Sequence, residues 1–339
     1  MVADHEHHLD LVGGRTLHYA EAGYPHSNDI VLFFHGAFAV GSIPEPLPLT
    51  LRERRVHSIA PTLPGWGTSS PPSNLRSYSK TVCEDVATLI RHLHPNGQNL
   101  LRLYIAGVSF GTVAAQMLYG APYDVFPFGD RIVGLLLVAP YSPFRMHKGY
   151  TKCLSWSRYF SIGPWAKHLP LNIVSVIRAS RLKDRLSTPE HATGFFREQL
   201  SAHMTSKDKK EYEAWLLAKG KSEMAFEDEV GEMMRQSVEG TWAGFIQIPK
   251  VLHAKWGYKL KKLGRDHEVS VLLVTMGADR EGTGMGDWLA KHMENVERWE
   301  VQGSGALGWL YMMDEIWAKF LAHTDSNPHV RVPMPVPPS

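Results

Sequence analysis

A strand, a tight turn and a helix follow one another around Ser109, and this succession limits the folds open to the chain. Residues 100–108 form a largely apolar run, and residues 112–119 have the pattern of a helix. Between them lies Gly107-Val108-Ser109-Phe110-Gly111, a G-x-S-x-G sequence. Its small residues allow a sharp strand-to-helix turn, which lifts the serine hydroxyl above the edge of a sheet. In this setting the motif predicts a nucleophilic serine rather than an ordinary Gly/Ser turn.

Short apolar runs alternate with helical patterns on both sides of this motif. Because such runs are apolar on both faces, they suit strands buried between two helical layers. The sequence therefore predicts an α/β fold with a mostly parallel central sheet flanked by helices. The expected strands are 30–34, 56–60, 100–108, 132–139, 269–276 and 296–301, and the expected helices are 78–94, 112–119, 285–293 and 308–322.

The pattern divides the chain into three parts. Residues 1–140 and 265–325 carry the strand signals and are expected to form the core, whereas residues 141–264 are expected to form an inserted helical lid. Residues 326–339 are rich in proline and predict an extended tail. Aromatic side chains of the lid either line an apolar pocket or pack the lid onto the core. They are Trp156, Tyr159, Phe160, Trp165, Phe195, Phe196 and Trp215.

A second turn, His35-Gly36-Ala37-Phe38, closes the first long strand. A tight turn there can aim a backbone N–H at the same point as the N–H of Phe110, and two such groups form an oxyanion hole. A plain strand-end turn is the alternative. We expect His35 to stabilise the turn rather than to act as a general base.

These segments resemble the α/β-hydrolase superfamily. The resemblance rests on IVLFFHGAF, APTLPGWGTSS and LYIAGVSFGTVAAQ in the first part of the chain, and on LLVTMGADR and VERWEVQGSGALGW in the last. It implies that Ser109 is the nucleophile and that Ala37 and Phe110 donate to the oxyanion, with Gly36, Gly107 and Gly111 supporting the two turns. It also implies that Asp279 is the acid that orients a histidine, the alternative being a plain turn or helix-capping residue.

Two positions depart from the family pattern. Thr62 stands where an aspartate is usual before PGWG, and Ala306 follows Gly303-Ser304-Gly305 where the resemblance implies the catalytic histidine. Neither His292 nor His323 is expected to replace it. Either Ala306 is an inactivating substitution in a serine hydrolase, or the chain is a naturally His-less lyase, cyclase or ligand-binding receptor.

The resemblance implies two-step acyl transfer on an ester, thioester or lactone of a medium-sized hydrophobic small molecule. A serine at this turn argues against the epoxide hydrolases and haloalkane dehalogenases of the superfamily, which need a carboxylate there. A serine without a base is a poor nucleophile, so a chain with Ala306 should bind its substrate and turn it over very slowly.

Composition argues against several other classes of protein, namely nucleic-acid-binding, membrane-spanning and secreted ones. A net charge of +2 gives no general field for nucleic acid or an anionic membrane, and no apolar run reaches the ~20 residues of a membrane span. Lys207–Lys210 and Lys259–Arg265 are expected to be solvated helix faces. No secretory signal is visible and only two cysteines occur, so a cytoplasmic location is expected.

No cofactor or metal is expected. Residues 303–308 match G-x-G-x-x-G, but a dinucleotide site would also need a following strand and an acidic residue ~20 positions on. His5, His7 and His8 flank Glu6 at a terminus expected to be frayed, and no metal-binding helix motif occurs.

Overall fold

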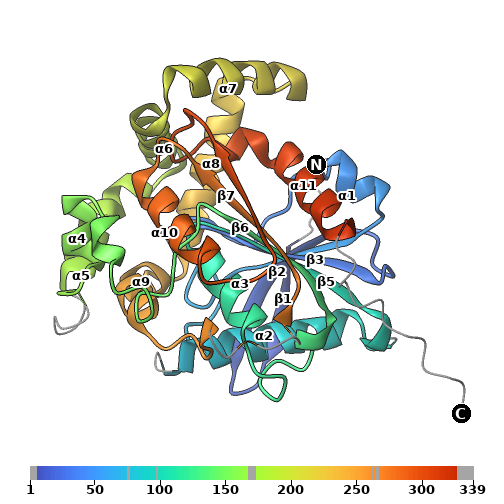
Figure 1. The fold of residues 1–339 in the computed structure, drawn as a ribbon. Helices are drawn as coiled ribbons and strands as arrows, with labels where there is room; N and C mark the ends of the chain where they lie inside the picture. Colours follow the sequence, from blue (N-terminus) through green and yellow to red (C-terminus); the bar gives the residue numbers. More distant parts are fainter. Residues whose placement is uncertain are drawn as a thin grey trace, which may run out of the picture.

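The computed structural model describes residues 6–74, 77–96, 98–166, 173–260, 263 and 267–326, which are built around one eight-stranded sheet (Figure 1). The strand order is β1-β2-β4-β3-β5-β6-β7-β8. β2 pairs antiparallel with both β1 and β4, and the remaining neighbours are parallel. The strands are β1 (Glu6–Leu11), β2 (Arg15–Gly23), β3 (Asp29–Phe34), β4 (His57–Pro61), β5 (Arg102–Val108), β6 (Ile132–Val138), β7 (Ser270–Met276) and β8 (Val296–Val301).

The central strands are buried on both faces, as their sequences require. β6 and β7 are buried along their whole length, and β5 is buried after Arg102. Leu103 and Ile105 face one core, whereas Tyr104 and Ala106 face another. This alternation puts hydrophobic side chains on both sides of the sheet, so each side needs a covering layer of helices.

Helices supply that cover on both faces (Figure 1). α2 (Tyr78–Leu93), α3 (Gly111–Tyr119) and α10 (Arg280–Ala290) contribute to the first core. The short α1 (Leu49–Glu53) and the long α11 (Trp309–Asp325) contribute to the second. The predicted α/β architecture with a mostly parallel sheet is therefore confirmed.

A helical insertion connects β6 to β7. Between these strands the described residues contain no further strand. A third apolar core, which includes Phe196, Tyr212 and Phe226, holds part of the insertion together. Its α-helices are α4 (Trp156–Ile162), α5 (Ile173–Lys183), α6 (Pro189–His203), α7 (Ser206–Lys219), α8 (Glu223–Glu239) and α9 (Ala243–His253).

The N-terminal segment differs from the expectation. His7 and His8 do not lie in a frayed terminus, because they belong to β1 and pair with Tyr19 and His18 of β2. α10 begins at Arg280 rather than at 285, since Asp279 forms its N-terminal cap. No helix in the described part of the chain is long and apolar enough to cross a membrane.

Two expectations fall largely on residues that the structure does not describe. Of the proline-rich tail 326–339 only Ser326 is described, and His5 also lies outside the described ranges. Of the basic stretch 259–265 only residues 259, 260 and 263 are described.

Candidate active site

Ser109 occupies the sharp turn between β5 and α3. Its backbone has φ +50°, in the left-handed region that a non-glycine residue rarely adopts, and its N–H donates to the Val138 carbonyl at 2.9 Å. A Cβ on Gly107 would lie 2.6 Å from the Gly111 carbonyl oxygen, and one on Gly111 would overlap the Phe34 carbonyl. Both glycines are therefore needed for the turn to close. The Ser109 side chain is partly exposed at its apex.

The turn after β3 lies beside Ser109. A Cβ added to Gly36 would lie 3.4 Å from the Ser109 Cβ, so the two turns are in direct contact. Within the described residues, neither the Ala37 N–H nor the Phe110 N–H donates to a protein acceptor. Two backbone donors without protein partners next to a serine are the parts from which an oxyanion hole is made.

His35 fixes this turn through both of its ring nitrogens. The Leu63 N–H donates to Nε2 at 2.9 Å, so Nδ1 carries the proton and donates to the Gly36 carbonyl at 2.7 Å. Burial lowers the pKa of His35 to about 4 despite the opposing effect of the Gly36 hydrogen bond. His35 is therefore neutral at pH 7, and both of its ring nitrogens are engaged in the turn rather than with Ser109.

Asp279 follows β7 at the same edge of the sheet. Its Oδ1 accepts a hydrogen bond from the Glu281 N–H at 3.1 Å and so caps α10. Burial raises the pKa of the Asp279 carboxyl, and hydrogen bonds from the backbone of Gly282 and Glu281 partly offset this. Since β6 lies between β5 and β7, Asp279 and Ser109 are attached to strands about 10 Å apart. Among the described residues, Asp279 and Ser109 share no hydrogen bond.

The loop that carries Ala306 adjoins the Asp279 turn. The Gly277 N–H donates to the Val301 carbonyl at 2.9 Å, and the Ala278 N–H donates to the Ser304 carbonyl at 2.8 Å. These bonds hold the ends of β7 and β8 together. Ala306 thus lies on a loop that is bonded to the turn before Asp279, and its methyl group has no proton-accepting atom.

The rings of His203, His292 and His323 are engaged elsewhere. His292 stacks on Trp288 and its Nδ1 bonds the Trp288 carbonyl, while His323 contacts Glu297 at 3.0 Å. The main chain of His203 packs against Gly305, yet its exposed ring bonds the Gln199 carbonyl of its own helix. None of these contacts brings a ring to Ser109.

Asp208 of α7 is a residue that sequence reasoning missed. It is fully buried and accepts hydrogen bonds from the Ser304 hydroxyl at 2.6 Å, the Gly305 N–H at 2.7 Å and the Tyr311 hydroxyl. Burial by itself would raise its pKa, but these bonds and one from the Thr205 N–H outweigh that effect and lower the pKa to about 2. The insertion thus clamps the loop that carries Ala306.

A local signal for this residue was present. Thr205 and Asp208 stand three positions apart and form a capping box at the start of α7. The stretch 207–210 was expected to be a solvated face, and that expectation is wrong for Asp208. Lys207 is also engaged, because its Nζ donates to the Gln302 carbonyl at 2.8 Å.

The aromatic residues of the insertion do not share one environment. Trp156 is 81% exposed, and Phe160 and Trp165 are also exposed, so these three side chains are neither enclosed in a pocket nor buried against the core. Phe195 and Phe196 are buried, and Tyr159 is partly buried. Phe195 reaches the turn after β3, where its ring centroid lies 6.4 Å from that of Phe38.

Phe38 is the centre of an aromatic cluster beside Ser109. It has φ +59° and its ring centroid lies 4.9 Å from Phe245 and 6.0 Å from Trp66. Trp66 in turn lies 6.3 Å from Phe110. Aromatic side chains from the core and from α6 and α9 therefore surround the turn that carries Ala37.

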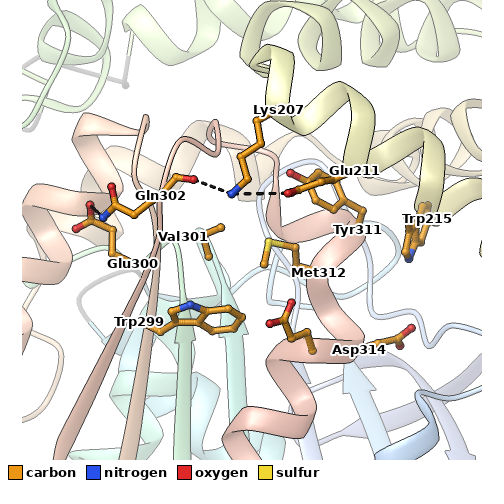
Figure 2. A pocket seen from close by; sticks show the side chains of 11 residues that line it. Lys207, Glu211, Trp215, Trp299, Glu300, Val301, Gln302, Tyr311, Met312 and Asp314 are labelled. Atoms are coloured by element: carbon orange, nitrogen blue, oxygen red, sulfur yellow. Dashed lines mark hydrogen bonds and ion pairs between the residues drawn. The ribbon is translucent and has the colours of Figure 1, made fainter.

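A separate groove lies on the outer side of β8, between α7 and α11 (Figure 2). Its volume is about 490 Å³, and Lys207 of α7 reaches across it to the Gln302 carbonyl and also pairs with Glu211 of its own helix. None of the residues from the two turns around Ser109 lines it. Trp215 lines this groove rather than a pocket above Ser109. The groove is therefore distinct from the candidate active site.

Comparison with known proteins agrees with the arrangement of these parts. The model of a family described as the alpha/beta hydrolase family matches residues 31–319. Among curated protein sequences, no relative matches this chain.

Solved structures give the same fold at low sequence identity. An esterase from Exiguobacterium antarcticum is 16% identical with a TM-score of 0.60, covering 94% of this chain and 99% of its own. A carboxylesterase structure from Nitrososphaera gargenis is 15% identical with a TM-score of 0.59, also covering 94% and 99%. A thioesterase domain from the curacin biosynthetic pathway is 17% identical with a TM-score of 0.55, covering 94% and 98%. The family match spans most of the sequence and the fold agrees with it, so this chain belongs to the alpha/beta hydrolase family.

Proposed function

We propose that the protein is a serine hydrolase scaffold that cleaves an ester-like bond by acyl transfer through Ser109, and that Ala306 disables it. The proposal rests chiefly on one observation. Ser109 projects from a strained turn beside the Ala37 and Phe110 N–H groups, neither of which bonds a described residue. Such donors stabilise the negative oxygen that forms when a serine attacks a carbonyl.

Each step of the proposed reaction has a group in place except one. The Ser109 oxygen adds to the substrate carbonyl, whose oxygen becomes negative between the Ala37 and Phe110 N–H groups. A base must take the serine proton and return it to the leaving alcohol or thiol, after which water releases the acid. With histidine at position 306, Asp279 would orient that base. With alanine there, a loss of about 10⁶ in turnover is expected.

We also propose that residues 141–264 act as a lid that shapes the substrate site. Phe195 of α6 and Phe245 of α9 contact Phe38, next to the oxyanion donors. The Gly244 N–H donates to the Gly65 carbonyl at 2.7 Å, which fixes the start of α9 against the loop after β4. The aromatic surroundings favour a medium-sized hydrophobic acyl compound.

A panel of chromogenic esters with acyl chains of increasing length tests this function. The matched set is the unchanged chain, Ala306→His, and Ala306→His combined with Ser109→Ala. We expect Ala306→His to raise turnover by about 10³-fold or more and the added Ser109→Ala to abolish the gain. A gain that survives Ser109→Ala would contradict the proposed nucleophile.

A naturally His-less lyase, cyclase or receptor is the second candidate, and one observation favours it. Asp279 already caps α10, and Asp208 already accepts hydrogen bonds from Ser304 and Gly305. Both segments therefore have hydrogen-bond partners without an imidazole. For this candidate, Ala306→His would leave the affinity for apolar ligands unchanged and would produce no turnover of any ester.

A further inference from the structure

The charge of the chain is distributed very unevenly. Residues 131–183 contain nine Lys and Arg residues and no Asp or Glu, although the whole chain has a net charge of only +2. Five of these cations are exposed and form no ion pair with a described residue. They are Arg145, Lys148, Lys152, Arg181 and Lys183. The remainder of the sequence carries more acidic than basic residues, so the excess positive charge lies in this segment, and eight of its nine cations belong to the insertion.

Large hydrophobic side chains are exposed in the same part of the chain. Trp156 and Phe160 are 81% and 59% exposed and stand one helical turn apart on α4, where their rings stack. Trp165 is 64% exposed. On α5, Ile173, Val176 and Ile177 are 43–49% exposed at the spacing of one helix face. We call these six residues the apolar ridge.

The two helices that carry most of the ridge are neighbours. α4 contacts α5, and both pack against α9. In Figure 1 the two helices lie at the left margin, away from α7 at the top and from α1 and α11 on the right. Arg158 of α4 forms an ion pair with Glu281 at 2.8 Å, which ties the ridge to the helix that Asp279 caps. The ridge is therefore attached close to the turn that bears a candidate site residue.

We propose that the apolar ridge docks the protein on a bilayer that contains anionic phospholipid. Exposed Trp and Phe side chains insert at the boundary between headgroups and acyl chains, and short amphipathic helices lie in that plane. Lys152, Arg181 and Lys183 would then meet lipid phosphates and carboxylates, which attract basic residues next to a membrane surface. A net charge near zero does not prevent this, because the contact depends on the local charge within a Debye length.

The same observations disfavour other occupants. A second copy of the chain would bring two sets of these cations together, and residues 131–183 supply no carboxylate to place between them. Nucleic acid could use the cations and the exposed rings of α4, but Ile173, Val176 and Ile177 on α5 offer a base neither charge nor a flat ring, whereas acyl chains would cover both helices. The combination of exposed apolar side chains with cations around them fits a lipid surface best.

Vesicle co-sedimentation tests the proposal, and it does not depend on catalysis. The full chain is mixed with vesicles of phosphatidylcholine alone or of equal parts phosphatidylcholine and phosphatidylserine. We expect the affinity for the anionic vesicles to exceed that for the neutral vesicles by about tenfold or more, and to fall as the salt concentration is raised. Trp156→Ser with Phe160→Ser should reduce binding about tenfold or more. Lys152→Glu with Arg181→Glu should remove the preference for anionic lipid.

Leu217→Ser with Met224→Ser is the matched control. These side chains are 83% and 66% exposed but lie on α7 and α8, outside the ridge. The control should bind vesicles like the unchanged chain, and thermal melts should show that all variants fold.

Three results would overturn the inference. The first is equal affinity for neutral and anionic vesicles, or an affinity that Trp156→Ser with Phe160→Ser leaves unchanged. The second is equally tight, ridge-dependent binding of soluble polyglutamate, which would assign the surface to an acidic polypeptide. The third is a dimer in sedimentation equilibrium that Trp156→Ser with Phe160→Ser dissociates, which would assign it to self-association.

Discussion

Asp208 of the insertion and Ser304 of the loop after β8 are joined by a hydrogen bond of 2.6 Å that is completely buried. The same carboxylate accepts from the Gly305 N–H and the Tyr311 hydroxyl. An ionised acid with this many donors is strongly favoured over its protonated form, which is why its pKa falls to about 2. The insertion and the sheet are thus linked at the segment that carries Ala306.

Replacing Asp208 with Asn should destabilise the protein by about 2–4 kcal/mol, because charge-assisted hydrogen bonds are lost and a buried donor is left facing N–H and O–H groups. Urea unfolding measures the change. Asp314→Asn is a suitable control, since Asp314 pairs with Lys219 at the surface and should cost less than about 1 kcal/mol. Equal losses of unfolding free energy in the two variants would contradict a stabilising role for the hydrogen bonds between Asp208 and the loop after β8.

Gly305→Ala should be costly, because the added Cβ would overlap the His203 carbonyl oxygen and lie 3.2 Å from the Asp208 carboxylate. The loop must shift to accommodate it, with an expected loss of about 2–3 kcal/mol. The control is Gly194→Ala, in the middle of α6, where an added Cβ meets nothing within 4 Å. That variant should be stabilised by about 0.5–1 kcal/mol. Thermal unfolding distinguishes the two, and a neutral Gly305→Ala would show that the loop is not tightly packed.

Stability should fall on acidification because of His35. Its folded pKa of about 4 lies below the ordinary value of 6.5, so the unfolded chain binds the proton first as the pH falls. Its contribution is complete above about pH 6.5 and is lost progressively down to about pH 4, amounting to about 3 kcal/mol. His35→Gln removes this titration, so its unfolding free energy should vary less over that range. An unchanged pH dependence would show that folding does not shift the pKa of His35.

Much of the core could be predicted because local residue patterns indicate which segments are buried and where the chain turns. The apolar runs that form β3, β5, β6 and β7 are short, are bounded by turn residues and are typical of buried strands, and the glycines beside Ser109 are typical of the turn before α3. β8 was also found, although it is a partly exposed edge strand. β1 and β2 were missed because histidines and charged residues interrupt their alternation, and their pairing with each other and with β4 is what makes them strands.

The site could be predicted only where the chemistry is local. Ser109 and its supporting glycines are contiguous in sequence, and so is the turn from His35 to Phe38. Asp208 could not be connected with Ser304, because the two are 96 positions apart and only the packing of α7 on the loop after β8 joins them. The exposure of Trp156 and Phe160 was equally hidden, since an aromatic pair at helical spacing looks the same whether it faces the core or the solvent.

Covalent labelling with a fluorophosphonate, read by peptide mass spectrometry, tests the proposed role of Ser109 most directly. The Ala306→His protein should gain one adduct on the peptide that contains Ser109, at a rate about 10³-fold or more above that of the unchanged chain. Adding Ser109→Ala should abolish it. Absence of labelling in Ala306→His, or labelling at another residue that persists in Ser109→Ala, would contradict the assignment of Ser109 as the nucleophile.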